Sequence, residues 1–209
     1  MSEILSDKVR ILVIEDHFVT LDGMVGGLSR EPDFEIVGSC VTAEAGIALA
    51  DKERPEVIIT DLHVPGNFNP TALIKELMRF PDRKLVLFSV ETRLAYVQAV
   101  LSLGVSAYLS KSEPFSVVAD TVRQVMKGRT GIVSQHLTRE FCNITPSETE
   151  ILHMLGKGMK YAEIGDARST SVATARKQCE ILQMKLGLQN REQLIAWSVQ
   201  NGYGNFDLG

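Results

Sequence analysis

The sequence predicts an α/β protein with a second, all-helical part, and three observations support this. Residues 1–128 alternate short β-branched runs with amphipathic stretches, which is the pattern of repeated β-α units around a parallel sheet. Acidic residues directly follow two of these runs, where the carboxyl ends of parallel strands form a crevice. From residue 144 onward only helical patterns occur. We therefore expect a doubly wound five-stranded parallel sheet, in the order 2-1-3-4-5, followed by a small all-α domain.

The strands and helices of the first part are marked by apolar runs and by local start and stop signals. Asn and Thr favour the position just before a helix, Pro favours its first turn, and Gly favours the position after its end. The predicted strands cover 9–14, 35–40, 57–60, 84–88 and 105–109. Thr42 precedes a predicted helix over 43–53, and Asn69 with Pro70 precedes one over 71–80. Gly104 and Gly128 mark the ends of the fourth and fifth helices.

The second part begins after a segment without clear periodicity, residues 129–143, which is predicted to link the two domains. Thr145-Pro146-Ser147-Glu148 forms a capping box with proline at the first helical position. Domains are therefore expected at 1–128 and 144–209. The predicted helices cover 146–155, 161–168, 172–186 and 191–201, with Ser171 and Asn190 as caps of the last two.

Composition limits the class of protein. The net charge is −4, and residues 144–209 hold 7 basic against 7 acidic residues, so overall charge does not indicate nucleic acid binding. No apolar run approaches the ~20 residues of a membrane span, and Met1 to Arg10 lacks a secretory signal, so a cytoplasmic location without membrane contact is expected. Cys40, Cys142 and Cys179 form no C-x-x-C and are expected to be reduced, structural thiols.

Acidic side chains gather at the predicted switch point of the sheet. Glu15 and Asp16 follow the first strand and Asp61 follows the third, and these strands are neighbours in the expected order. Three crowded carboxylates repel one another unless a cation neutralises them, and a hard dication such as Mg²⁺ fits oxygen ligands. Lys111, after the fifth strand, can supply a second positive charge. We expect no ligand role for the imidazole side chains of His17, His63, His136 and His153, which are interpreted as solvated or structural.

The same crevice contains a candidate nucleophile and two candidate switch residues. A carboxylate such as Asp61 can accept a phosphoryl group to form an aspartyl phosphate. The hydroxyl of Ser89, at the end of the fourth strand, could bond a new phosphoryl oxygen. Tyr108, on the fifth strand, could then move into the vacated space, which gives a two-position element biased by added charge.

These residues resemble the receiver domain of two-component response regulators. The resemblance rests on Glu15-Asp16, Asp61-Leu-His-Val-Pro65-Gly66, Ser89 and Tyr108-Leu-Ser-Lys111, and covers residues 8 to about 128. It implies that a sensor histidine kinase phosphorylates Asp61, that Lys111, Ser89 and Tyr108 are its lysine and switch residues, and that the main-chain carbonyl of His63 completes the Mg²⁺ site. Ser112 stands where many receivers have proline, so the cis peptide bond usual at that position is not assumed.

The helices over 159–168 and 171–186, separated by Ser169 and Thr170, have the proportions of a helix-turn-helix. Residues 144–158 together with Glu163-Ile164, Ser171, Thr174, Lys185-Leu186-Gly187 and Asn190-Arg191 resemble the LuxR-type DNA-binding domain. Joined to a receiver, this implies a NarL/FixJ-type response regulator that binds double-stranded DNA as a homodimer. The residues expected to contact DNA are Thr174, Arg176, Lys177, Glu180 and Lys185, with Arg176 and Lys177 foremost.

Other functions stay open at this stage. The helical part departs from its family at Lys160, Gly165, Arg168, Thr170 and Glu180, so a degenerate output domain that binds another protein, or acts independently of phosphorylation, is the alternative. A Mg²⁺-dependent phosphatase is disfavoured, because such enzymes carry a second acid two residues after the nucleophile, where His63 stands. We therefore expect a regulator and not an enzyme.

Overall fold

The computed structural model describes residues 8–135, 137 and 144–204. Contacts among the described residues form two compact units, the first holding residues 8–92 and Ala99–Ser134, and the second holding Arg93–Gln98, Gln135, Leu137 and residues 144–204. His136, Cys142 and most of the predicted linker after residue 135 lie outside the described residues. In the part of the chain that is described, no helix has the length and apolar character needed to cross a membrane.

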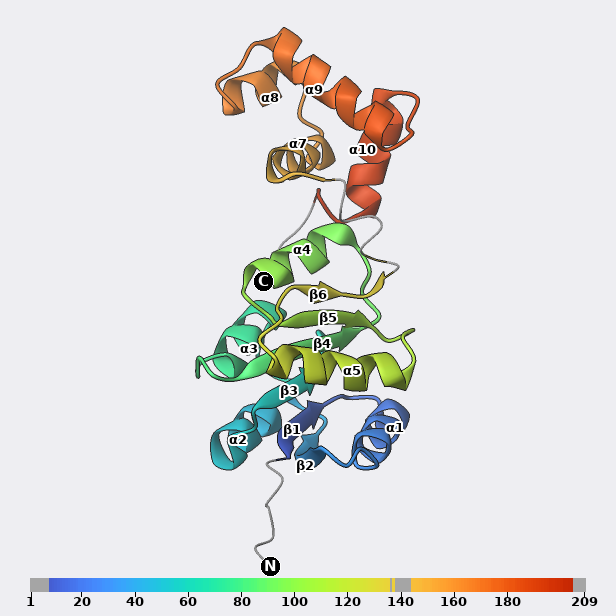
Figure 1. Ribbon diagram of the computed structural model, residues 1–209. Coiled ribbons are helices and arrows are strands. Elements are labelled where there is room, and N and C mark those ends of the chain that lie inside the picture. Colours follow the sequence, from blue (N-terminus) through green and yellow to red (C-terminus); the bar gives the residue numbers. More distant parts are fainter. Residues whose placement is uncertain (1–7, 136, 138–143, 205–209) are drawn as a thin grey trace, which may run out of the picture. The chain divides into compact units, whose positions relative to one another are not determined.

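The first unit is built on a parallel sheet in the order β2-β1-β3-β4-β5-β6 (Figure 1). The predicted order of the first five strands is therefore confirmed. The fifth strand begins two residues later than predicted, after Ser106, whose amide already bonds the Leu85 carbonyl. The strands are β1 (Val9–Ile14), β2 (Phe34–Cys40), β3 (Val57–Thr60), β4 (Lys84–Ser89), β5 (Ala107–Ser110) and β6 (Ile132–Val133).

The sixth strand was not predicted, because it lies inside the segment expected to be a linker. Two residues are too few to show the alternation by which strands are predicted. β6 is defined instead by its partner strand: the amide of Ile132 donates to Ser106 at 3.3 Å, and the amide of Ser134 donates to Tyr108 at 3.1 Å.

Five helices alternate with the strands, as predicted. The side chains of Thr42 and Asn69 accept hydrogen bonds from the first turns of α2 and α3, which confirms both caps. α3 ends at Leu77, whereas the prediction extended it to residue 80. The Arg83 guanidinium donates to the Leu77 carbonyl at 2.8 Å, which satisfies a group that the helix leaves unbonded at its end. The helices are α1 (Phe18–Leu28), α2 (Ala43–Glu53), α3 (Pro70–Leu77), α4 (Leu94–Ser102) and α5 (Phe115–Met126).

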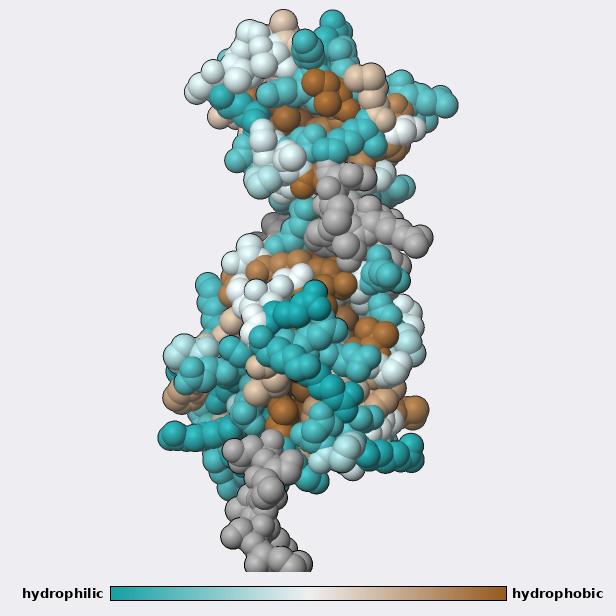
Figure 2. Space-filling model, viewed as in Figure 1, coloured by the Kyte–Doolittle hydropathy of each residue, from teal (hydrophilic) through white to brown (hydrophobic). Residues whose placement is uncertain are grey.

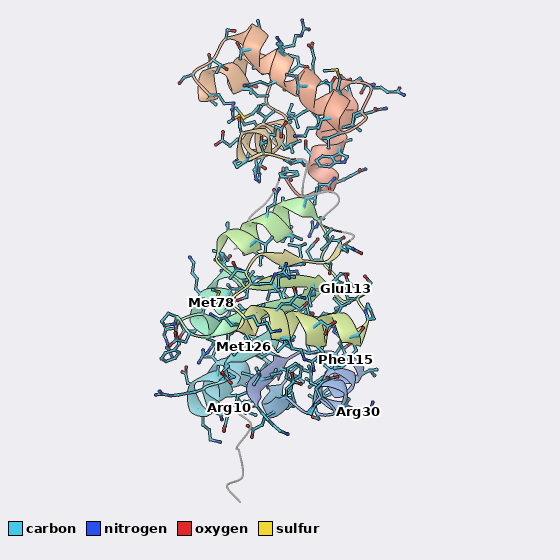
Figure 3. The ribbon with its side chains drawn as sticks, in the orientation of Figure 1. Arg10, Arg30, Met78, Glu113, Phe115 and Met126 are labelled. Atoms are coloured by element: carbon cyan, nitrogen blue, oxygen red, sulfur yellow. The ribbon has the colours of Figure 1, made fainter. Side chains whose placement is uncertain are left out.

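α1 and α5 cover one face of the sheet, and their apolar residues join those of the central strands in one core (Figure 1). Burial of each such side chain contributes about 1.5–3 kcal/mol. The two helices approach closely because residue 27 is glycine: a Cβ there would lie 2.6 Å from the ring of Phe115, which is labelled at the start of α5 in Figure 3. This packing fixes the position of the last turn of α1 against α5.

The second unit contains four described helices: α7 (Pro146–Gly156), α8 (Tyr161–Ala167), α9 (Val172–Lys185) and α10 (Arg191–Gln200). The predicted capping box of Thr145 and Glu148 is present, and Ser171 and Asn190 cap α9 and α10. Hydrophilic residues are interspersed with small hydrophobic patches over the visible surface of the unit (Figure 2). Its buried core includes Ile151, Leu152, Leu155, Ile164, Ala175, Cys179, Leu182, Leu194 and Tyr203.

Candidate functional site

The acids of the predicted crevice lie together at the carboxyl ends of β1 and β3. The amide of Asp61 bonds the Ile14 carbonyl at 3.0 Å, so the sheet ladder continues to the end of both strands and sets the two acidic segments side by side. Ligand atoms of Glu15, Asp16 and Asp61 all lie within 4.8 Å of one another, together with one of His17. This group of side chains, called the acidic cluster below, could hold a metal ion.

Lys111 reaches into the acidic cluster from the end of β5. Its Nζ lies 2.7 Å from a carboxylate oxygen of Glu15 and 2.7 Å from Oδ2 of Asp61. All three side chains are largely buried, with exposed fractions of 12% for Lys111, 4% for Glu15 and 6% for Asp61. One cation therefore neutralises two carboxylates that are shielded from water.

Electrostatics keeps this arrangement charged. Burial by itself would raise the pKa of Asp61, but the hydrogen bond and charge of Lys111, helped by Ser89 and the Leu62 amide, outweigh burial and hold that pKa below its ordinary value. Burial likewise opposes the charge of Lys111, but Asp61 and Glu15 raise its pKa. Asp61 is thus an anionic, oriented carboxylate, which is the form that a nucleophile needs.

The two candidate switch residues are both connected to Glu91. Ser89 is fully buried, and its Oγ accepts a hydrogen bond from the Glu91 amide at 3.3 Å. Tyr108 is also fully buried, and its hydroxyl donates to the Glu91 carbonyl at 2.8 Å. The backbone of Glu91 therefore joins Ser89, whose hydroxyl hydrogen-bonds the Asp61 carboxylate, with the tyrosine of the neighbouring strand.

The loop after Asp61 is held against the start of α2. The Ala43 amide donates to the Pro65 carbonyl at 2.9 Å, and the Asn67 amide donates to Glu44 at 2.7 Å. Gly66 adopts φ 151° and passes so close that a Cβ would lie 2.6 Å from the Glu44 carboxylate. The side chain of His63, within this loop, is exposed, and the ligand role of its carbonyl stays a prediction.

His17 is the member of the cluster that the sequence analysis did not select. Its Nδ1 lies 2.8 Å from Oδ1 of Asp16 and 3.2 Å from Oε1 of Glu15. The sequence signal for its place in the cluster was its position directly after the two acids, but an isolated histidine is more often solvated than bound at a site. At the other end of the site, near Ser112, the described residues include no cis peptide bond.

In the second unit, all five expected DNA contacts lie exposed on α9: Thr174, Arg176, Lys177, Glu180 and Lys185. Arg176 and Glu180 lie one turn apart, with Nε and Oε1 separated by 3.9 Å. A groove of about 680 Å³ is lined by Tyr161, Val172, Ala173, Arg176, Lys177 and Glu180.

The fifth expected contact, Lys185, is engaged within the fold. Its Nζ lies 2.7 Å from the Glu148 carboxylate, which also closes the capping box of α7. The positive charge of Lys185 therefore links the end of α9 to the start of α7.

Two of the unusual residues of the helical part have structural roles. The guanidinium of Arg168, whose side chain is 13% exposed, donates to the Ser147 carbonyl at 3.3 Å and to its hydroxyl at 2.6 Å, and pairs with Glu150. Arg168 thus joins α8 to α7 where an apolar residue is usual. Gly165 permits a tight turn, since a Cβ there would lie 3.0 Å from the Thr170 carbonyl.

The carboxyl edge of the doubly wound parallel sheet holds an acidic crevice with a buried lysine and two hydroxyl side chains, and a helix-turn-helix unit follows this sheet. This combination defines a response regulator. The chain belongs to the response regulator receiver domain family, which it matches over residues 11–123.

Similar proteins match both parts of the chain. It is 25% identical to the transcriptional regulatory protein DegU of Brevibacillus brevis, over 96% of this chain and 97% of DegU. It is 27% identical to the transcriptional regulatory protein DesR of Bacillus subtilis, over 93% and 98%. The fold matches the RcsB response regulator of Salmonella typhimurium with a TM-score of 0.64 and 24% identity, over 93% of this chain and 99% of that one. The expected NarL/FixJ-type organisation is confirmed.

Proposed function

We propose that this protein is a two-component response regulator in which phosphorylation of Asp61 by a sensor histidine kinase controls DNA binding by the helical domain, and hence transcription. The observation that carries this proposal is the contact of one buried lysine with Glu15 and Asp61. The proposed domains are the receiver at 1–128 and the DNA-binding domain at 144–209, joined by a linker at 129–143 whose first part adds the short strand β6 to the receiver sheet.

In the proposed reaction, an oxygen of the Asp61 carboxylate attacks the phosphorus of a phosphohistidine on the kinase. The O–P bond forms as the P–N bond breaks, and the electron pair leaves with the imidazole nitrogen. The Nζ of Lys111, which lies 2.7 Å from Asp61, neutralises the negative charge on the oxygens of the transferred phosphoryl group. Phosphoryl transfer relies mainly on such positioning and charge neutralisation.

The carboxylates of the acidic cluster fit a divalent cation, because their oxygen atoms are gathered around one point. Glu15, Asp16 and Asp61, with the carbonyl of His63, would hold Mg²⁺. Bound there, Mg²⁺ would neutralise charge on the transferred phosphoryl group.

Glu91 supports the proposed switch. When Ser89 shifts to donate to a phosphoryl oxygen on Asp61, the Glu91 amide that donates to its Oγ shifts with it. A shift of this backbone moves the carbonyl that holds the Tyr108 hydroxyl. Charge added at Asp61 is thereby converted into a movement on the neighbouring strand.

The exposed face of α9 supports DNA as the target. Its position as the second helix of a helix-turn-helix is the one that enters the major groove, and Arg176 and Lys177 are placed to contact bases or phosphates. DegU and DesR are transcriptional regulatory proteins, and RcsB is known as a DNA complex. We further propose that the active form is a homodimer.

Charge pairing favours the alternative of a protein target. Glu180 lies beside Arg176, and Lys185 is paired with Glu148, so few positive charges on α9 are free of a nearby acid. A protein partner for the helical domain is therefore the second candidate.

One experiment separates the two outputs. Duplexes are selected from random DNA by the full chain, with and without beryllofluoride, which mimics an aspartyl phosphate. We expect enrichment of a sequence that depends on beryllofluoride and on salt, and loss of this dependence in Asp61→Asn. Failure to enrich any duplex in either state would support the protein target, and enrichment that Asp61→Asn leaves unchanged would refute the switch.

A further inference from the structure

The imidazole of His17 lies inside the acidic cluster. Its Nδ1 is 2.8 Å from Asp16 and 3.2 Å from Glu15, and it belongs to the group of ligand atoms within 4.8 Å of one another. Two ligands that share one ion, each about 2.0–2.2 Å from it, lie at most ~4.4 Å apart. Only a small contraction would place a nitrogen and three carboxylates around a single ion.

The rest of His17 already fixes this position. Its amide donates to Oε1 of Glu15 at 3.0 Å, so the backbone is held at the edge of the cluster. The residue stands at the N-cap position of α1, but its side chain makes no capping hydrogen bond. The ring is directed to the acids and not to the helix, and it is 70% exposed, which leaves the ring accessible to an ion from solvent.

A nitrogen donor changes the metal that a site prefers. Carboxylate and carbonyl oxygens suit Mg²⁺ and Ca²⁺, whereas imidazole suits transition metals such as Fe, Ni, Cu and Zn. Mg²⁺ also retains its water ligands and gains little from a nitrogen. When His17 is included, the donors of the site are one imidazole nitrogen and several carboxylate oxygens, which suits a transition-metal ion.

We propose, building on the proposed function, that His17 is a metal ligand and that its imidazole raises the affinity of the receiver site for first-row transition-metal dications but not for Mg²⁺. The residue acts as a specificity determinant of the phosphoacceptor site. Glu15, Asp16 and Asp61 bind any hard dication, and His17 adds the preference for transition-metal dications.

The first test is calorimetric titration of the full chain with Ni²⁺ and with Mg²⁺. In His17→Gln we expect the affinity for Ni²⁺ to fall roughly tenfold or more and that for Mg²⁺ to stay within about twofold. His153→Gln, which changes a histidine outside the cluster, should alter neither affinity, and Phe18→Ala controls for disturbance of the loop. Equal Ni²⁺ affinity in the wild type and in His17→Gln would overturn the inference.

The second test reads the ligand directly. Electron spin echo spectra of the Mn²⁺-loaded chain should show modulation by an imidazole nitrogen, which is absent in His17→Gln and retained in His153→Gln. Modulation that persists in His17→Gln refutes a ligand role for this residue. If the wild type binds neither Ni²⁺ nor Mg²⁺, the metal site of the proposed function itself fails; if it binds Mg²⁺ and ignores His17, only this inference fails.

Discussion

Replacement of Lys111 by methionine tests the electrostatics of the acidic cluster. The change removes the charge that lies 2.7 Å from both Glu15 and Asp61, and it keeps most of the apolar stem. Two carboxylates, 4% and 6% exposed, then remain buried without their cation. Removal of one partner from a buried ion pair costs about 3–5 kcal/mol. Methionine also avoids the cost of burying the charged lysine, which reduces this loss. We therefore expect the free energy of unfolding to fall by about 2–4 kcal/mol.

Mg²⁺ should offset part of this loss. A ligand at a hundred times its Kd stabilises the folded state by about 2.7 kcal/mol, and the ion takes over the neutralisation that the lysine provided. The assay is urea denaturation followed by circular dichroism, in EDTA and in saturating MgCl₂. Lys127→Met, at an exposed lysine after α5, is the matched control and should stay within about 0.5 kcal/mol of the wild type. Equal stability of Lys111→Met and wild type in EDTA, or a difference that Mg²⁺ leaves unchanged, would refute the reasoning.

Two further predictions concern the helical unit, whose unfolding can be followed by the fluorescence of Trp197, the single tryptophan. Gly156→Ala should lower its free energy of unfolding by about 1–3 kcal/mol, because a Cβ there would lie 2.6 Å from the backbone of Gly204; an unchanged urea midpoint would contradict this close approach. Glu148→Gln should flatten the acid side of the stability profile. Burial opposes the charge of Glu148, but Lys185 and the capping contacts lower its pKa below 4.5, so its contribution is complete above about pH 4.5 and is lost as the pH falls through the folded pKa. A variant that keeps the wild-type slope below pH 4.5 would show that another carboxyl is responsible.

The sequence predicted those parts of the fold that rest on local patterns. Apolar runs and caps such as Thr42 and Asn69 located the strands and helices, and the rule for parallel sheets put Glu15 and Asp61 at one edge. Each of these inferences needed only neighbouring residues and one general rule of topology.

The features that the sequence analysis missed depend on distant partners. The bonds of the Arg168 guanidinium to Ser147 and the ion pair of Lys185 with Glu148 could not be predicted from the sequence. His17 joined the acidic cluster only through the direction of its ring. Long, flexible side chains can reach partners in many directions, so spacing along the chain does not determine where they point.

The short strand β6 has a practical consequence for any truncated version of this protein. A fragment that stopped at residue 128 would lack Ile132 and Ser134, and the outer backbone of β5 would lose the hydrogen bonds that it now makes to them. Unsatisfied strand edges recruit other chains. Such a fragment should self-associate at concentrations where one extended through residue 135 stays monomeric, so the shorter piece would give a false picture of dimerisation by the receiver.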